Sequence, residues 1–268
     1  MARTFIGIIV VLAIFAGLGA LGWYVVKEKI RSKQEYLLSA DKIVVSPSPD
    51  WVPDGFVEDV LRSSGLNKTS LLDKTLPQKL VEAFAAYPWI EKVEQVVPRY
   101  PSGAEVKLSY RAPAALVETP QRSMVPVDRN GVVLPPEYLS NAISDRRNDH
   151  LIVQGIQSMP LGSAGTPWGD PLVQTAAQLA AALTDDADTV QSLTLKWIIP
   201  ALEPAPGGSR IVCRLKTLAG TEIYWGSFAL DDPTFESKKK KLWDLHEQFR
   251  QSLDNVPASF RPIDLSRE

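Results

Sequence analysis

Residues 93–111 read VEQVVPRYPSGAEVKLSYR, and this stretch decides the fold of the first half of the chain. Val93–Val97 predicts a strand, and Arg99–Gly103 predicts a turn because of its proline and glycine. Ala104–Arg111 predicts a second strand, because apolar and polar side chains alternate along it. Val106, Leu108 and Tyr110 share one side of this strand, and Glu105, Lys107 and Ser109 share the other. The stretch therefore predicts two neighbouring strands joined by a turn.

Two amphipathic helices and a short strand precede these strands. Pro53–Ser64 has apolar residues on one helical face, and Gly65 is a helix stop. Asp73 is placed to cap a second helix, which Pro88 ends. Lys42–Ser46 predicts the short strand. The order strand–helix–helix–strand–strand predicts a small α+β module that closes near residue 111.

The rest of the body predicts a second module, rich in strands and flanked by helices. Asp128–Gly131 is expected to be the turn of a hairpin. Asp170 and Pro171 open an alanine-rich helix, because aspartate caps a helix and proline suits its first turn. Later strands are expected at Val190–Ile199, Arg210–Thr217, Thr221–Trp225 and Phe260–Leu265, with a last helix over residues 233–253. The predicted fold class is α+β, with a mixed β domain after the first module.

A long uncharged stretch lies near the start of the chain. Thr4–Val26 contains 23 residues and no charged side chain. A helix of that length extends about 35 Å, which is enough to cross a membrane. A cleaved signal peptide is the alternative, with Ala20–Gly22 as a cleavage site, but the length of the stretch favours an anchor. The expected organisation is a cytoplasmic stub (1–3), a transmembrane helix (4–26), a juxtamembrane stem (27–41), a first domain (42–112) and the β domain (113–268).

The charges beside this stretch leave its orientation open. Four basic residues follow it: Lys27, Lys29, Arg31 and Lys33. The positive-inside rule alone would place the body in the cytoplasm, whereas a large following domain is often exported whatever its flanking charges. The sequence is compatible with either orientation.

Composition excludes several functional classes. The formal net charge of −2 argues against a nucleic-acid binder, which needs a concentrated basic face. The single cysteine, Cys213, alternates with apolar neighbours and is expected in the core. His150 and His246 are too few for a histidine-rich metal centre, and His246 is expected on the surface of a helix. No catalytic residue, metal site, cofactor or small-molecule substrate is expected.

Five short motifs follow one another along the body. They are Tyr87–Val93 (YPWIEKV), Pro98–Pro101 (PRYP), Tyr110–Ala115 (YRAPAA), Val127–Val133 (VDRNGVV) and Ile263–Leu265 (IDL). In order and spacing, these motifs resemble the FtsQ/DivIB family of bacterial cell-division proteins, and the first module resembles that family's POTRA domain. The chain departs from the family pattern at Tyr110, where the family has glutamate, and at Pro262, which removes a backbone donor from the last strand.

This resemblance implies a non-enzymatic scaffold of the division complex. It would be a single-pass protein of the cytoplasmic (inner) membrane, with its bulk outside the cytoplasm at the division site. The implied partners are bitopic division proteins and the septal peptidoglycan synthesis machinery, bound by strand addition to the last strand. The implied contact residues are Phe260, Arg261, Ile263 and Leu265, with Tyr224 and Trp225 on the neighbouring strand. Two alternatives stay open: another POTRA-bearing envelope protein in transport or secretion, and an anchored envelope enzyme with an unrecognised site.

Overall fold

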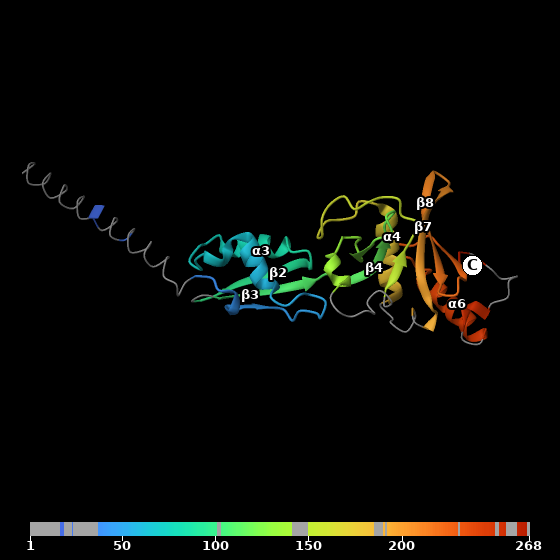
Figure 1. Cartoon of the computed structure of the whole chain (residues 1–268), viewed down its shortest axis with the longest axis horizontal. Helices are drawn as coiled ribbons and strands as arrows, with labels where there is room; N and C mark the ends of the chain where they lie inside the picture. The colour runs from blue at the N-terminus through green and yellow to red at the C-terminus, as the bar shows by residue number, and fades with distance from the viewer. Residues whose placement is uncertain are drawn as a thin grey trace, which may run out of the picture. The chain divides into compact units, whose positions relative to one another are not determined.

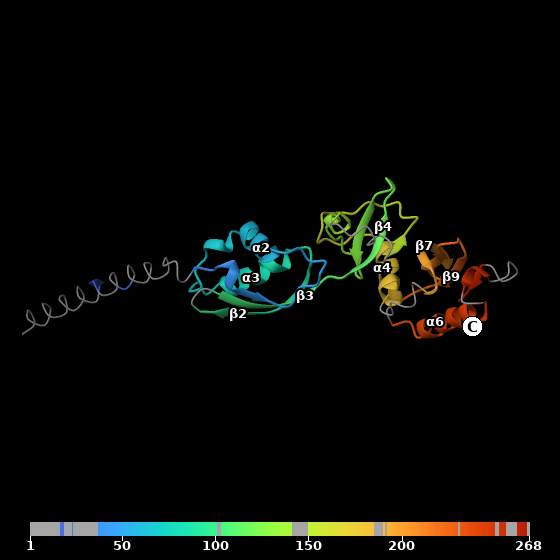
Figure 2. The same cartoon turned by 60° about the horizontal axis from the view of Figure 1, so that its bottom comes forward.

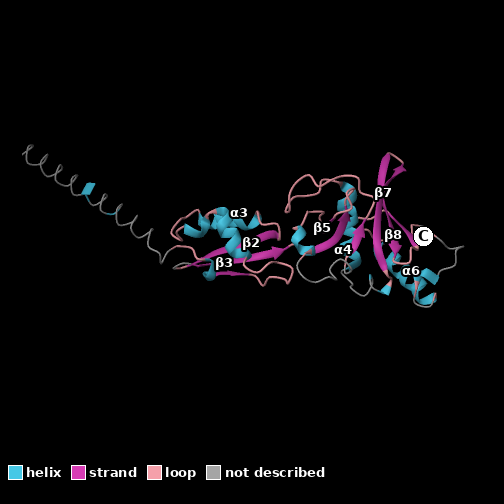
Figure 3. Cartoon of the chain, in the orientation of Figure 1, coloured by secondary structure: helices cyan, strands magenta, loops and turns pink. Residues whose placement is uncertain are grey.

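The computed structural model describes residues 17, 18, 23, 37–100, 103–140, 150–184, 190, 192–229, 231–249, 252–255 and 262–266. The expected transmembrane helix (4–26) lies outside them apart from residues 17, 18 and 23, as does most of the expected stem. No helix in the described part is long and apolar enough to cross a membrane. The chain divides between Tyr110 and Arg111 into two compact units. Helices and strands occur in both, which confirms the α+β class (Figure 3).

The first unit is a small sheet covered by two helices. Its elements are β1 (Ile43–Val45), α2 (Phe56–Ser64), α3 (Leu76–Ala85), β2 (Ile90–Arg99) and β3 (Gly103–Tyr110), with short 3-10 helices at Ala40–Lys42 and Leu66–Lys68. The strand order is β1-β3-β2, with β1 parallel and β2 antiparallel to β3. Both α-helices lie on one face of this sheet (Figures 1 and 2). The predicted order strand–helix–helix–strand–strand is therefore confirmed.

The core of the first unit follows from the apolar faces of these elements. The alternation in β3 buries Val106 and Leu108, whereas Lys107 is exposed. Phe56 of α2 packs edge-to-face on Phe84 of α3, with ring centroids 6.4 Å apart. The left-handed backbone of Gly65 (φ 70°) ends α2, as the sequence predicts. These contacts hold both helices against the sheet.

Asp73 stabilises the turn before α3, and this contribution is expected to depend on pH. Its carboxylate accepts hydrogen bonds from the Thr75 amide (2.9 Å) and the Lys79 ammonium (2.9 Å). These bonds, led by the Thr75 amide, lower the pKa of Asp73 from 3.8 to about 2. Because the folded-state pKa is the lower one, the stabilisation is present above about pH 4 and is lost as the pH falls towards 2. In Asp73→Asn, the unfolding free energy should therefore vary less with pH over this interval, as measured by urea titration; an unchanged slope would contradict this role.

The second unit is built on one mixed sheet and two long helices. Its strands are β4 (Pro113–Glu118), β5 (Met124–Asp128), β6 (Leu151–Val153), β7 (Leu195–Ala205), β8 (Gly208–Thr217), β9 (Glu222–Gly226) and β10 (Ile263–Asp264). Its helices are α4 (Pro171–Thr184) and α6 (Phe235–Gln248), with short 3-10 helices at Pro136–Leu139 and Leu253–Asn255. The described strands are ordered β10-β9-β8-β7-β6-β4-β5. The pairs β4–β6, β6–β7 and β9–β10 are parallel, and the others are antiparallel.

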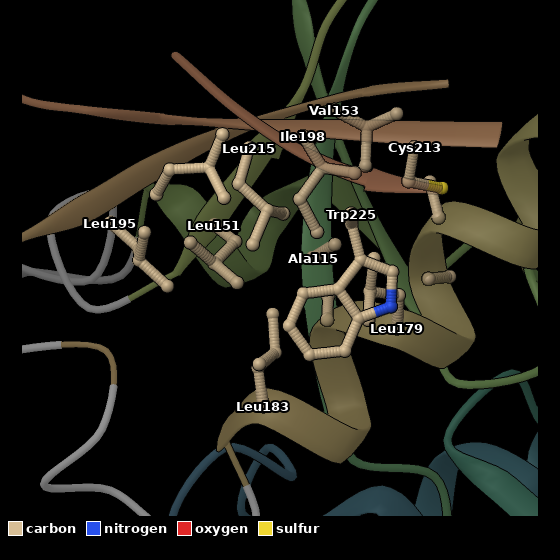
Figure 4. Close-up of a cluster of buried hydrophobic side chains, with 14 of the residues drawn as sticks. Ala115, Leu151, Val153, Leu179, Leu183, Leu195, Ile198, Cys213, Leu215 and Trp225 are labelled. Carbon is tan, nitrogen blue, oxygen red and sulfur yellow. The ribbon is translucent and has the colours of Figure 1, made fainter. Parts of the chain in front are cut away.

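One apolar cluster joins the sheet to both helices. Leu179 and Leu183 of α4 belong to one buried cluster with Cys213 and Trp225 of the sheet (Figure 4). Leu242 of α6 belongs to the same cluster, so both helices cover the same face. Ala176, Ala177 and Ala180 of α4 are fully buried in the same cluster. We call the opposite side of the sheet the outer face.

Two predicted boundaries in this unit are wrong. The strand expected from Val190 begins at Leu195, because Val190 and residue 192 are helical. The last helix is expected to continue to residue 253 but ends at Gln248, and a separate 3-10 turn covers Leu253–Asn255. In both places apolar residues alone did not distinguish a helix end from the element beside it.

Candidate functional site

The candidate site lies at the β10 edge of the second sheet. Among the described residues β10 pairs with β9 and with no other strand, and Ile263 lies opposite Ile223 in parallel register. The amide of Leu265 donates to the carbonyl of Tyr224 (2.9 Å). Backbone groups alternate in direction along a strand, so the amide of Asp264 points away from β9. Pro262 directly precedes the strand, where proline is tolerated.

The structure brings four of the six predicted contact residues together but buries three of them. Ile263 and Leu265 are each 4% exposed, and Trp225 is fully buried. Their side chains belong to the core cluster, so they support the edge from the core side of the sheet. Tyr224 is half-buried and faces the outer side of the sheet. Phe260 and Arg261 lie outside the described residues.

Tyr224 belongs to a charged cluster that sequence reasoning missed. Its hydroxyl donates to Glu203 (2.7 Å), and the same carboxylate lies 3.8 Å from both Arg210 and Arg214. Partial burial and the Glu203 charge raise the pKa of Tyr224. The cluster forms because strand register places Glu203 opposite Arg210 and Arg214 opposite Tyr224. The only sequence signal is that each of these residues lies on the polar side of an alternating strand. This alternation does not indicate which of the residues contact one another.

A shallow depression of about 440 Å³ links this cluster to β10. Arg214 and Tyr224 line one side of it, and Pro262, Asp264 and Ser266 line the other. The edge strand therefore has a partly charged surface beside it on the outer face. An added strand could contact this surface with every second side chain.

A buried lysine fixes the start of α6 beside the end of β9. The Lys238 ammonium donates to the Ser227 carbonyl (3.2 Å), contacts Asp232 (3.4 Å), and lies 5.7 Å from the centroid of the Trp225 ring. Burial opposes ionisation of Asp232, but the Thr234 and Lys238 hydrogen bonds outweigh it and lower the pKa of Asp232. Lys238 thus connects the start of α6 to the end of β9. Its aliphatic chain is packed inside the unit, and its charge is paired.

Cys213 and both histidines are packed against neighbouring side chains. Cys213 is fully buried, and burial raises the pKa of its thiol to about 12, which makes it a poor nucleophile. The surface position expected for His246 is wrong: it is 7% exposed and packs edge-on against Trp243. His150 contacts the Tyr138 hydroxyl through Nε2 (2.7 Å). Within the described ranges, no three His, Cys, Asp or Glu side chains cluster as metal ligands would.

The β10 edge thus has one side that no described strand covers, with a partly charged surface beside it on the outer face. Comparison with protein-family models and with curated proteins finds no match to this chain.

Proposed function

We propose that this chain is a non-enzymatic, membrane-anchored scaffold of the bacterial division complex. Residues 4–26 would form its anchor, the first unit a POTRA-like domain, and the second unit the platform for bitopic partners and the septal wall-synthesis machinery. The sequence resemblance to FtsQ/DivIB proteins supports this role. The observation that carries it is the β10 edge, which pairs with β9 on one side and adjoins the outer-face charges.

Strand addition at β10 explains how such an edge would hold a partner. The main chain of the partner would supply affinity by pairing with β10, and its alternate side chains would supply specificity. On the outer face those side chains would meet Tyr224 and Arg214, which line the same depression as Asp264. Ile263 and Leu265 would keep the edge in place from the core side.

The two variants Asp264→Pro and Asp264→Ala test this edge. Both remove the carboxylate that accepts the Ser266 amide (2.9 Å), but only proline also removes the amide directed away from β9. Each is expressed in the host cell with a fluorescent protein at its N-terminus and an export-dependent reporter at its C-terminus. We expect Asp264→Ala to gather at the division site with an exported C-terminus, and Asp264→Pro to be exported but dispersed.

Other outcomes would overturn parts of the proposal. A cytoplasmic C-terminus in the parent protein would contradict the proposed scaffold role. Uniform export of the parent would point to a transport or other envelope role. If both variants localise to the division site, the result supports the scaffold role but refutes the β10 edge as its binding surface. Equal thermal midpoints for the two variants would show that dispersal is not caused by unfolding.

A further inference from the structure

Leu37 and Leu38 join one end of the first unit. Leu37 forms an antiparallel bridge with Ser70, and the Leu38 amide donates to the Thr69 carbonyl (2.9 Å). Thr69 and Ser70 lie in the loop between α2 and α3. Residues 27–36 separate Leu37 from the proposed anchor, and ten residues extend at most about 36 Å. The end of the unit that contains Leu37 is therefore the end that the anchor would keep closest to the membrane.

The turn between β2 and β3 lies at the same end. A short 3-10 helix that ends at Lys42 connects Leu38 with β1, and β1 and β3 start at the same level because they are parallel. Gly103, the first residue of β3, packs against the Lys42 carbonyl, where a Cβ atom would clash. Tyr100 follows β2 in this turn, and it is 67% exposed. We call this end, formed by the loop 65–75, Lys42 and Tyr100, the proximal end.

The proximal end carries basic side chains that its acidic residues do not balance. The charged side chains described there are the ion pairs Asp73–Lys79 and Glu105–Arg99, the acidic residue Asp41, and the exposed lysines Lys42 and Lys74. Each ion pair is neutral as a whole, so the two exposed lysines outnumber the remaining carboxylate. The net charge of these residues is therefore positive.

The opposite end of the first unit, which we call the distal end, is acidic. It contains the start of α2 and the end of β3, since Phe56 packs on Tyr110 with ring centroids 6.1 Å apart. The end of α3 and the start of β2 lie there too, because Phe84 contacts Phe56 and Ile90 pairs with Tyr110. The charged residues on these segments and on the loop before α2 are the acidic residues Asp50, Asp54, Glu58, Glu82, Glu91 and Glu94, the basic residues Lys92 and Lys107, and the ion pair Asp59–Arg62. An anionic surface would therefore attract the proximal end and repel the distal end.

We infer that the proximal end of the first unit binds an anionic lipid surface, with the Tyr100 ring at the headgroup level and Lys74 beside the lipid phosphates. Tyrosine favours this level because its ring is apolar and its hydroxyl is polar. Each lysine near such a surface favours binding by about fivefold. The inference rests on the proposed anchor, residues 4–26, but it holds for either orientation of the chain. It gives the first unit one orientation relative to the membrane, with its acidic end pointing away.

Two cysteine reporters, Asn67→Cys and Lys92→Cys, compare the two ends of the unit. Both positions are exposed, whereas Cys213 is fully buried and burial raises the pKa of its thiol to about 12. A thiol-reactive fluorophore therefore marks only the new cysteine. The full chain is reconstituted into vesicles of phosphatidylcholine mixed with phosphatidylglycerol, which is anionic. The vesicles also contain a nitroxide-labelled lipid that quenches a fluorophore near the headgroups, and vesicles of phosphatidylcholine alone are the charge control.

Lys74→Glu and Tyr100→Ser are tested with the Asn67→Cys reporter, and Lys92→Glu is the matched charge reversal at the distal end. In the anionic vesicles we expect strong quenching at Asn67→Cys and little at Lys92→Cys. Lys74→Glu should lower the fraction of protein in contact about fivefold or more, whereas Lys92→Glu should leave it within about twofold of the parent. Tyr100→Ser should lower it as well. Equal thermal midpoints of the variants would show that these losses are not caused by unfolding.

Two results would overturn the inference. The first is equal quenching at the two ends. The second is strong quenching at Asn67→Cys that persists in phosphatidylcholine alone and in both proximal variants, because the anchor would then hold this end near the bilayer without a contact. Protein that leaves the vesicles at high salt would contradict the anchor, and the inference with it. Protein that stays on the vesicles without these effects would contradict the inference alone.

Discussion

Replacing Asp128 with alanine is expected to lower the free energy of unfolding by about 3–5 kcal/mol, because it removes a carboxylate that balances a largely buried charge. The Arg111 guanidinium donates to Asp128 Oδ2 (2.6 Å), and the two side chains are 16% and 2% exposed. The other carboxylate oxygen, Oδ1, accepts the amides of Asn130 (2.8 Å) and Val132 (2.9 Å). One side chain therefore holds both the start of the second unit and the turn after β5.

The variant Asp128→Asn separates these two roles. Asparagine keeps an oxygen that can accept the turn amides but loses the charge that pairs with Arg111. We expect it to fall between the parent and Asp128→Ala when unfolding free energies are measured by urea titration with a common m-value. An alanine variant within about 1 kcal/mol of the parent would show that the pair and the turn contribute little.

The turn at Asp128 is an example of a feature that the sequence predicts. The residue types of Asp128–Gly131 predict a hairpin turn, and the structure has one there, with Gly131 at φ 71°. The alternation in β3 and the helix stop at Gly65 follow equally from local chemistry. These features depend on residues that are neighbours in sequence, so a single chain is enough to predict them. The ion pair between Arg111 and Asp128 joins residues 17 positions apart, and no local pattern predicts it.

The α6 helix shows why burial is harder to predict than periodicity. Its buried face contains Lys238, Leu242 and His246, which are spaced four residues apart. A lysine and a histidine on a core-facing stripe contradict the usual polar pattern, whereas the sequence predicts His246 on the helix surface. Lys238 is tolerated there because the Ser227 carbonyl and Asp232 lie within reach of its ammonium. Those partners come from the loop after β9, which no pattern within the helix reveals.

The position of the candidate contact residues follows from the resemblance, whereas the charged surface beside them follows from no sequence pattern. The sequence resemblance placed contacts on the last strand and its neighbour, and the structure pairs those strands. It could not identify Glu203, Arg210 and Arg214, because these residues meet only through the register of three strands. It also treated Tyr224 and Trp225 alike, although adjacent residues in a strand point to opposite faces.

Because Trp225 and Tyr224 point to opposite faces of the sheet, variants of these two residues distinguish a core role from a surface role. Trp225 is fully buried, its ring lies 5.6 Å from that of Phe235, and Lys238 sits over it. Trp225→Ala should lower the unfolding free energy by about 3–5 kcal/mol, because it removes a large core side chain and leaves a cavity. Trp225→Phe should cost less, since it keeps an aromatic ring and deletes an indole N–H that has no partner in the described part of the chain.

Tyr224→Phe removes only the hydroxyl that donates to Glu203, so its effect on stability should be about 1 kcal/mol or less. Urea unfolding of the three variants, together with localisation of each fusion, distinguishes the two roles. If Tyr224 belongs to the binding surface, Tyr224→Phe should disperse the protein while it remains folded. Trp225→Phe should keep its localisation, because the main chain of β9 still supports β10. If Trp225→Phe disperses the protein without any loss of stability, the partner contacts the core side of the edge. That result would contradict the assignment of Trp225 to the core.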